Sequence, residues 1–150
     1  MSPSRSEKTA TLLYANPEID ADMLYFSKFL APDPFLAIGL GRQRIGILSP
    51  LEIGRASKDS GFTEILSLTD VRSSAKRALG VENPKISDII RFIAQSYKID
   101  RFRVPHSFPY AIAKELEKAR IAVALGPDPF IPARAKKNDE EAKAIREGNK

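Results

Sequence analysis

Short apolar runs alternate along the chain with segments in which hydrophobic residues recur every three or four positions. The continuous runs predict buried strands at 11–15, 35–40, 44–48, 63–68, 102–104 and 121–125. The segments between them predict amphipathic helices, one capped by Asp20 or Asp22 and others over 49–60, 69–80, 83–97 and 107–119. Strands that alternate with helices predict a layered α/β domain whose sheet is covered on both faces.

Two of these strands form a predicted hairpin. The runs 35–40 and 44–48 are joined only by Gly41-Arg42-Gln43, a short glycine-containing connection typical of antiparallel neighbours. An antiparallel pair within a strand–helix alternation makes the predicted sheet mixed rather than purely parallel.

The helices carry clear local signals. Ser49-Pro50-Leu51-Glu52 predicts a helix start with Ser49 as N-cap, Pro50 in the first turn and Glu52 closing a capping box. Gly80 fits the left-handed residue past a helix end. The predicted buried faces are Met23, Phe26, Phe29 and Leu30; Ile86, Ile89, Ile90, Ile93 and Tyr97; and Ile112 with Leu116.

One short motif occurs twice. Pro32-Asp-Pro-Phe35 recurs as Pro127-Asp-Pro-Phe130. Because proline fixes φ and disfavours helix in the residue before it, both copies are predicted as rigid turns, each delivering a phenylalanine to the core.

The end of the chain predicts a helix with little apolar surface. Asn138 is a good N-cap and Glu141 stands at the capping-box position, but only Ala142, Ala144 and Ile145 are apolar. Burying an isoleucine contributes about 1.5–3 kcal/mol, whereas ordering each backbone residue costs about 1–2 kcal/mol. A helix with so little apolar surface either frays or is the first helix of a domain that this chain does not contain. We expect a mobile segment at 1–10 and a domain at 11–133, and the second of these two readings makes 134–150 a junction with the first helix of an absent domain.

Composition narrows the class of protein. The 150 residues are 43% hydrophobic and 29% charged, as in one globular domain, and contain no cysteine for disulfides, zinc or a thiol nucleophile. No run of about 18 apolar residues and no signal-peptide core is present, which predicts a cytoplasmic protein without a membrane partner. The net charge is +5, but basic residues alternate with acids along the chain, which favours a mixed solvated surface over a nucleic-acid interface.

The residues offer little catalytic chemistry. His106 is the one histidine, so it cannot build a His-rich metal site, and as a general base it has no glycine-flanked serine to activate. The predicted strand cores contain no Asp or Glu that could converge on metal ions. Gly39-Leu-Gly41 lies in a hairpin and lacks the third glycine of a dinucleotide fingerprint. We therefore predict no catalytic, cofactor-binding or metal-binding residue in this chain.

The order of several segments nevertheless resembles a known family, the N-terminal domain of Xaa-Pro aminopeptidases, prolidases and creatinases. The resemblance covers roughly residues 11–150. The residues that carry it are Leu24-Tyr-Phe-Ser-Lys-Phe29, Pro32-Asp33, Ser49-Pro-Leu-Glu52, Arg55-Ala56, Phe102-Arg-Val-Pro105, Phe108-Pro109, Arg134-Ala-Lys-Lys137 and Glu140-Glu-Ala-Lys-Ala-Ile-Arg146. One departure is Lys28, which stands where family members often carry glycine.

The resemblance implies a three-layer α/β sandwich with a mixed sheet and ribonuclease-H-like topology. It implies that catalysis takes place in a following pita-bread domain that holds two divalent metal ions, of the manganese or cobalt type in the peptidases, while creatinase relatives work without metal. It also implies that the N-terminal domain helps subunits associate and limits access to the active site. None of the metal-binding motif positions exists in this chain, so no catalytic residue is carried over.

The leading hypothesis is therefore a non-catalytic N-terminal domain of an Xaa-Pro peptidase-type hydrolase. Its expected partners are its own C-terminal catalytic domain and neighbouring subunits of a homo-oligomer. Two alternatives stay open: an autonomous protein-interaction domain, and a nucleic-acid-binding domain of ribonuclease-H-like fold. The substrate of the parent protein, whether an Xaa-Pro peptide, a dipeptide or a creatine-like compound, also stays open.

Overall fold

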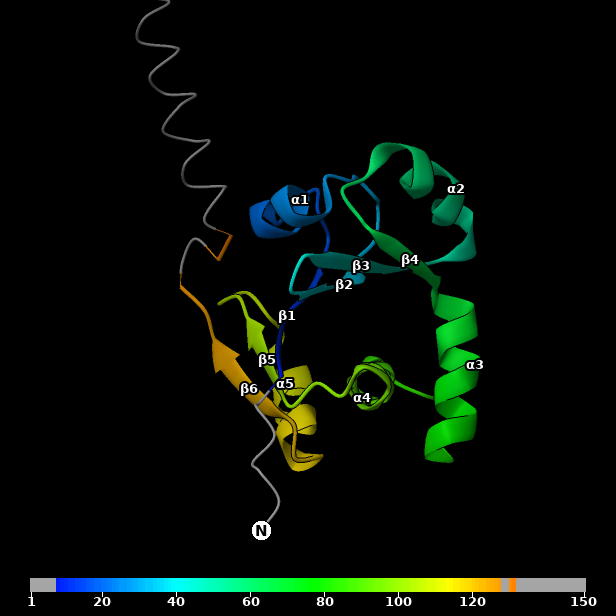
Figure 1. Cartoon of the computed structure of the whole chain (residues 1–150), viewed down its shortest axis with the longest axis vertical. Helices are drawn as coiled ribbons and strands as arrows, with labels where there is room; N and C mark the ends of the chain where they lie inside the picture. Colours follow the sequence, from blue (N-terminus) through cyan, green and yellow to red (C-terminus); the bar gives the residue numbers. More distant parts are fainter. Residues whose placement is uncertain (1–7, 128–129, 132–150) are drawn as a thin grey trace, which may run out of the picture.

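A computed structural model describes residues 8–127 and 130–131 (Figure 1). These residues form one six-stranded sheet in the order β4-β3-β2-β1-β5-β6. The strands are β1 (Thr9–Ala15), β2 (Phe35–Leu40), β3 (Gln43–Leu48), β4 (Glu64–Ser67), β5 (Arg101–Val104) and β6 (Ala122–Leu125). The helices are α1 (Ala21–Ser27), α2 (Pro50–Asp59), α3 (Leu68–Leu79), α4 (Ile86–Tyr97) and α5 (Tyr110–Lys118).

The sheet is mixed, as the hairpin predicted. β2 pairs antiparallel with both β1 and β3, whereas the β1–β5, β5–β6 and β3–β4 pairs are parallel. All strands except β2 therefore run in one direction. A three-stranded meander flanked by parallel strands, with helices on both faces, confirms the predicted three-layer sandwich of ribonuclease-H-like topology.

One face of the sheet is packed mainly with aliphatic side chains, and we call it the aliphatic face. Leu12 on β1 and Ile38 on β2 point to this side, where they meet Ile89, Ile90 and other buried residues of α3, α4 and α5. In Figure 1 these three helices lie below or beside the sheet. The predicted inward positions of α4 are confirmed, with Ile89, Ile90 and Ile93 fully buried.

The opposite face is packed with phenylalanines, and we call it the aromatic face. Leu13, the neighbour of Leu12, points to this side, because successive strand residues alternate between faces. Helices α1 and α2 cover it, above the sheet in Figure 1. Its buried cluster contains four phenylalanines, Phe26, Phe29, Phe35 and Phe130.

Glycines on the strands or directly after them make room for these rings. A Cβ atom on Gly46 would lie 2.6 Å from the Phe62 ring, and one on Gly126 would lie 2.5 Å from the Phe130 ring. The rings occupy the space that a larger strand residue would fill. Phe35 and Phe130 both lie in this cluster, which confirms that the two Pro-Asp-Pro-Phe motifs each deliver a phenylalanine to the core.

Strand β1 begins at Thr9, two residues earlier than predicted. Its parallel pairing with β5 starts there, and Ala10 is buried. Residues 9 and 10 are thus part of the sheet rather than of a mobile N-terminal segment.

Helix α1 is shorter than its predicted apolar face. The Asp20 carboxylate caps it by accepting from the Met23 N–H at 2.9 Å, as one of the two predicted alternatives. The helix ends at Ser27 because Lys28 is left-handed, with φ 51° and ψ 39°. A left-handed residue suits glycine, which gives a physical reason for the glycine that the resembled family often has here. Because the chain turns at Lys28, Leu30 is 53% exposed, so its assignment to the buried face was wrong.

The predicted capping box of α2 does not form. Pro50 is at the first helical position as predicted, but the Ser49 side chain makes no capping hydrogen bond. Glu52 instead forms an ion pair with Arg55, one turn further along the helix. A guanidinium at i+3 competes well for a first-turn carboxylate, because it carries a full charge whereas a backbone N–H does not.

The remaining helix boundaries differ slightly from the predictions. Ser67 caps α3, so the helix starts before Thr69, and α4 starts after Lys85 rather than at Asn83. Gly80 is left-handed, with φ 67°, as predicted. Leu116 of α5 is buried and Ile112 is partly buried against the same core. The predicted junction and terminal helix at 134–150 lie outside the described residues.

Candidate functional site

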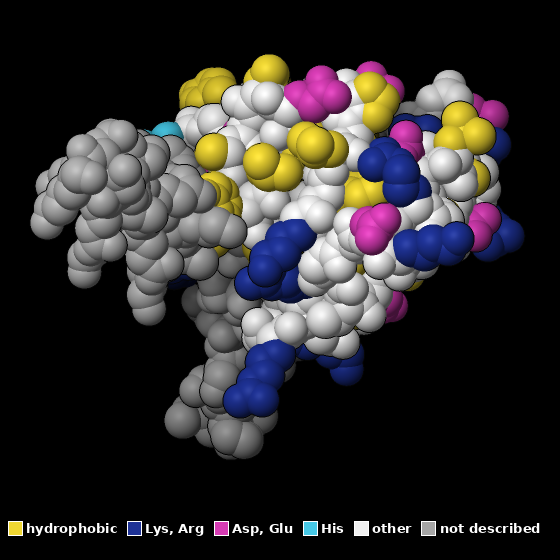
Figure 2. Space-filling model, turned by 90° about the horizontal axis from the view of Figure 1, so that it is seen from above, with side chains coloured by type: hydrophobic (Ala, Val, Ile, Leu, Met, Phe, Trp, Pro, Cys, Tyr) yellow, Lys and Arg dark blue, Asp and Glu magenta, His cyan; other side chains and the backbone are white. Residues whose placement is uncertain are grey.

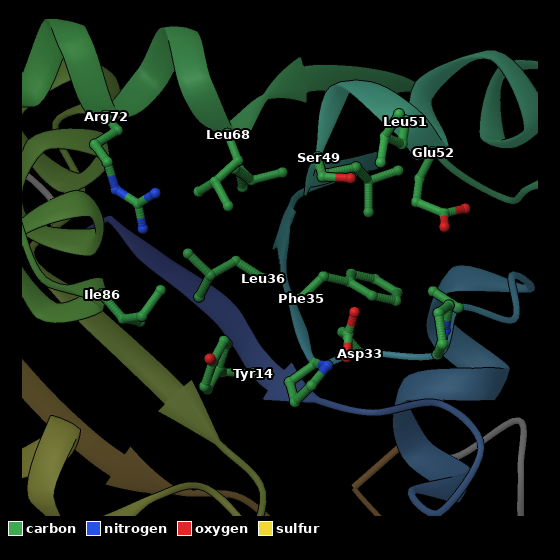
Figure 3. Close-up of a pocket in the computed structure, with 15 residues that line it drawn as sticks. Tyr14, Asp33, Phe35, Leu36, Ser49, Leu51, Glu52, Leu68, Arg72 and Ile86 are labelled. Atoms are coloured by element: carbon green, nitrogen blue, oxygen red, sulfur yellow. The ribbon is translucent and has the colours of Figure 1, made fainter.

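The edge of the sheet where the parallel strands end carries a cleft of about 450 Å³ (Figure 3). It lies where β1 and β3 finish, β2 begins, and helices α2, α3 and α4 start. In open α/β sheets, the carboxyl ends of strands are the usual place for a binding site, because loops and helix starts leave a crevice there. The topology therefore makes this cleft the first candidate site.

The floor of the cleft is apolar. Tyr14, Leu36 and Ile47 come from three neighbouring strands, and Leu68 and Ile86 from the starts of α3 and α4. Figure 3 shows Tyr14, Leu36 and Ile86 grouped below Leu68. All five side chains belong to the aliphatic face or pack against it. The cleft is therefore an opening into the edge of the main core.

Charged groups lie at opposite ends of the cleft. Arg72 of α3 reaches in at one end, while Asp33 and Glu52 lie at the other (Figure 3). Glu52 is already paired with Arg55. The Ser49 hydroxyl also borders the cleft, and it makes no capping bond to α2. The arrangement suits contact with a surface that is apolar in the middle and polar at the rim.

Exposed hydrophobic side chains gather at the same edge. Leu51, at the cleft rim, is 93% exposed, and Leu30 stands next to the lining residue Ala31. Ile19, Tyr110 and Leu125 are also exposed and follow or end the strands β1, β5 and β6 at their carboxyl ends. Apolar groups concentrated at one edge are typical of a protein-interaction surface.

The His106 side chain contacts the backbone of another segment of the fold. Its Nε2 atom lies 3.0 Å from the Gly126 carbonyl oxygen, which ties the end of β5 to the end of β6. The neighbouring Ser107 hydroxyl donates to the Asp20 carboxylate at 2.9 Å, rather than to the histidine. The structure therefore does not bring His106 and Ser107 together as a base and a nucleophile.

Two titrating groups with displaced pKa values lie away from the cleft. Burial, reinforced by the Glu64 carboxylate, raises the pKa of Tyr97, which links α4 to β4 through a hydrogen bond of 3.3 Å. The Ser87 hydroxyl, together with Lys85, lowers the pKa of Glu115. Both groups join neighbouring elements of the aliphatic face.

No metal centre is found among residues 8–127 and 130–131. No three His, Asp or Glu side chains of this part of the chain stand close enough together to hold a metal ion. The described residues thus offer no donor set for the two metal ions that the family resemblance implies. The described helices also include none long and apolar enough to cross a membrane.

Sequence comparisons find no relative: no protein-family model matches the chain, and no curated protein matches it. The fold, however, is found in solved structures of proline-specific peptidases. The chain is similar to an X-Pro aminopeptidase from Thermotoga maritima, with a TM-score of 0.59 and 14% identity over 81% of this chain. An Xaa-Pro dipeptidase from Bacillus anthracis matches with a TM-score of 0.55 and 14% identity over 77% of this chain.

The match covers only part of these larger proteins. The chain spans 32% of the Thermotoga protein and 28% of the Bacillus protein. An Xaa-Pro aminopeptidase chain from Streptococcus thermophilus is matched over 82% of both chains, with a TM-score of 0.55 and 12% identity. The family resemblance seen in the sequence is thus confirmed as a likeness of fold.

Proposed function

We propose that this chain is the non-catalytic N-terminal domain of an Xaa-Pro aminopeptidase- or dipeptidase-type hydrolase. The observation that carries the proposal is the match of fold to about a third of the Thermotoga X-Pro aminopeptidase. The order of the motifs from Leu24 to Phe108 supports it independently of the coordinates. In this proposal the metal ions and the catalytic residues belong to the parent protein's C-terminal domain.

The first test is an activity assay of the 150-residue chain. It should release no N-terminal residue from an Xaa-Pro peptide, with or without Mn²⁺ or Co²⁺. The control is the parent protein with its C-terminal domain, which should cleave the same peptide. Metal-dependent cleavage by the 150-residue chain alone would contradict the proposal.

The carboxyl-end edge is the proposed surface for the partner domain or subunit. It combines the apolar cleft with Leu51 and Leu30, whose exposed side chains contribute nothing to the domain's own core. Covering them removes apolar area from water, at about 25 cal/mol per Å². A domain attached here would hold the subunits of a cytoplasmic homo-oligomer together and narrow access to the active site.

This surface is tested by a charge substitution in the parent protein. Leu51→Asp should weaken subunit association, measured by analytical ultracentrifugation, and should let longer peptides be cleaved. Lys58→Asp, on the same helix but at its far end, is the control. Unchanged association and unchanged length selectivity in Leu51→Asp would remove this edge from the proposal.

An autonomous interaction domain is the second candidate, and the exposed apolar edge favours it equally. The reading frame after codon 150 separates the two. A continuing frame with two Asp, one His and two Glu in the metal-binding pattern supports the first candidate. A stop codon at that point supports the second.

A further inference from the structure

The part of the aromatic face that helices α1 and α2 leave open carries two arginines in one cross-strand row. Arg44 on β3 pairs with Gly39 on β2, Gly39 with Thr11 on β1, and Thr11 with Arg103 on β5. Directly paired residues project to the same side of a sheet. With strands about 4.8 Å apart, the two arginine Cα atoms are about 14 Å apart across the row. The residues between them are small, and the Phe26 ring lies over Gly39, where a Cβ atom would be 3.0 Å from the ring.

A cavity of about 420 Å³ lies over this row. We call it the arginine cavity. Its described lining residues are Thr9, Ala10, Thr11, Phe26, Gly39, Gly41, Gln43, Arg44, Arg103, Phe130 and Ile131. They include two cationic groups and three other polar side chains, and among them is no carboxylate. This volume is in the range of small-molecule sites.

Both guanidinium groups are held in place by phenylalanine rings. The guanidinium carbon of Arg44 lies 5.2 Å from the Phe26 ring centroid, and its Nη1 donates to the Phe26 carbonyl at 3.0 Å. The guanidinium carbon of Arg103 lies 5.5 Å from the Phe130 ring centroid. Stacking on a ring restrains the planar group while leaving its edge N–H donors available.

Neither arginine is neutralised within the described part of the chain. No ion pair joins Arg44 or Arg103 to a carboxylate there, although four ion pairs form elsewhere on the surface. Figure 2 shows the molecule from above, with Lys and Arg side chains at the lower left of the described surface and the Asp and Glu side chains further up and to the right. Two restrained cations over one cavity produce a local positive potential that attracts an anion.

We propose that the arginine cavity binds a small phosphate monoester. Two guanidinium groups match the charge of about −1.5 to −2 that a phosphate monoester carries at pH 7, and planar guanidinium donors fit its oxygens. The Thr11 hydroxyl, between the arginines in the row, adds a neutral donor. The remaining volume takes the organic part of the ligand. This site lies on the opposite face from the cleft, and the proposal is independent of the proposed peptidase relationship.

The test is a titration of the ¹⁵N-labelled 150-residue chain followed by NMR. Inorganic phosphate and glycerol 3-phosphate are added at constant ionic strength, with sodium chloride as the balancing salt. The amide signals of Thr11, Gly39 and Arg103 should shift and saturate on the order of 1 mM or below, while that of Ile90 stays fixed. Shifts that do not saturate, or that chloride reproduces, would overturn the proposal.

A matched pair of variants tests the role of the arginines. Arg103→Gln should weaken glycerol 3-phosphate binding about tenfold or more, since it removes one charge-assisted contact. Arg77→Gln removes an exposed arginine on α3, across the sheet, and should leave binding unchanged. Equal weakening in both variants would show only a general charge effect and would overturn the site.

A third experiment compares the binding of a carboxylate ligand with that of a phosphate ligand, and a conservative variant tests the Thr11 hydroxyl. Succinate should bind at least tenfold more weakly than glycerol 3-phosphate, and equal or tighter succinate binding would contradict the assignment to a phosphate monoester. Thr11→Val keeps the shape of the side chain and removes the hydroxyl. It should weaken binding about threefold, and unchanged binding would exclude the hydroxyl from the site.

Discussion

The two faces of the sheet are built in different ways. On the aliphatic face, three helices cover the strands mainly with Leu, Ile and Val side chains, together with Phe102 and Phe108. On the aromatic face, two helices and the segment at Phe130 cover the strands with phenylalanine rings, several of which lie against glycines. The first arrangement fills space with many medium-sized side chains, and the second with a few large rings.

The difference has a functional consequence. Among the described residues, no arginine lies over an aromatic ring in the core of the aliphatic face. Phenylalanines, in contrast, present their faces to cations, and Arg44, Arg55 and Arg103 each lie over one of these rings. The aromatic face is therefore the face on which charge can be placed close to the sheet, and the arginine cavity is found there.

The largest expected change in the free energy of unfolding comes from a substitution on the aliphatic face. Ile90→Ala should lower the free energy of unfolding by about 2–5 kcal/mol, because Ile90 lies on the fully buried face of α4 and the lost carbon atoms leave a cavity. Urea unfolding followed by circular dichroism measures the change. Leu30→Ala, at an exposed position, should change it by less than about 0.5 kcal/mol. Similar losses in both variants would contradict the described packing.

The aromatic face should be sensitive to added volume at its glycines. In Gly46→Ala the new methyl group would lie 2.6 Å from the Phe62 ring, so the ring must move, at a cost of about 1–3 kcal/mol. Gly54→Ala, on α2 with open space around it, should instead stabilise the protein by about 0.5–1 kcal/mol. The same unfolding experiment decides whether the two substitutions have opposite signs.

The turn after α1 offers a stabilising substitution. Lys28→Gly should raise the free energy of unfolding by about 0.5–1 kcal/mol, because the left-handed conformation at φ 51° strains a side-chain-bearing residue. Lys58→Gly, inside α2, should lower it by a similar amount. A loss of stability in Lys28→Gly would show that the lysine side chain stabilises this turn of the aromatic face.

The smallest expected effect is a change in the pKa of Glu115, whose hydrogen bond with Ser87 links α5 to α4. The pKa of Glu115 lies below its ordinary value of about 4.5, chiefly because the Ser87 hydroxyl donates to its carboxylate. A lowered folded-state pKa stabilises the fold above the unfolded-state pKa, and this contribution is lost as pH falls through the folded value.

Ser87→Ala should therefore raise the pKa of Glu115 toward its ordinary value, measured by NMR titration of the side-chain carboxyl carbon. Ser96→Ala removes another hydroxyl of α4, which donates to the Phe92 carbonyl, and should leave that pKa unchanged. An unshifted pKa in Ser87→Ala would show that Lys85 and Lys118, rather than the hydroxyl, are responsible for the lowering.

Local sequence signals predicted most of the elements, because strands and helices are set by periodicity over a few residues. The hairpin at 35–48, the αL residue Gly80 and the buried stripe of α4 all follow from neighbours in the chain. The predictions failed where a competing contact decided the outcome. Glu52 pairs with Arg55 instead of capping α2, and the turn at Lys28 carries Leu30 outward.

The candidate sites depend on contacts between distant segments. The cleft brings Tyr14, Ile47 and Arg72 to one edge, and no motif marks any of them in the sequence. The arginine cavity depends on strand register, which sets Thr11 opposite Gly39 on one side and Arg103 on the other. A shift of one residue in either pairing would send these side chains to the other face.

The sequence by itself determined the elements, their order and the α/β class, because hydrophobic periodicity and cap residues act within a few positions of one chain. Only the tertiary structure decided that Phe26, Phe29, Phe35 and Phe130 meet on one face of the sheet, while most of the buried Ile residues pack on the other. It also decided that Arg44 and Arg103, 59 positions apart in number (103 − 44), lie over the same cavity. The physical reason is that backbone pairing between strands sets which residues meet, and that pairing is selected by the packing of the whole domain.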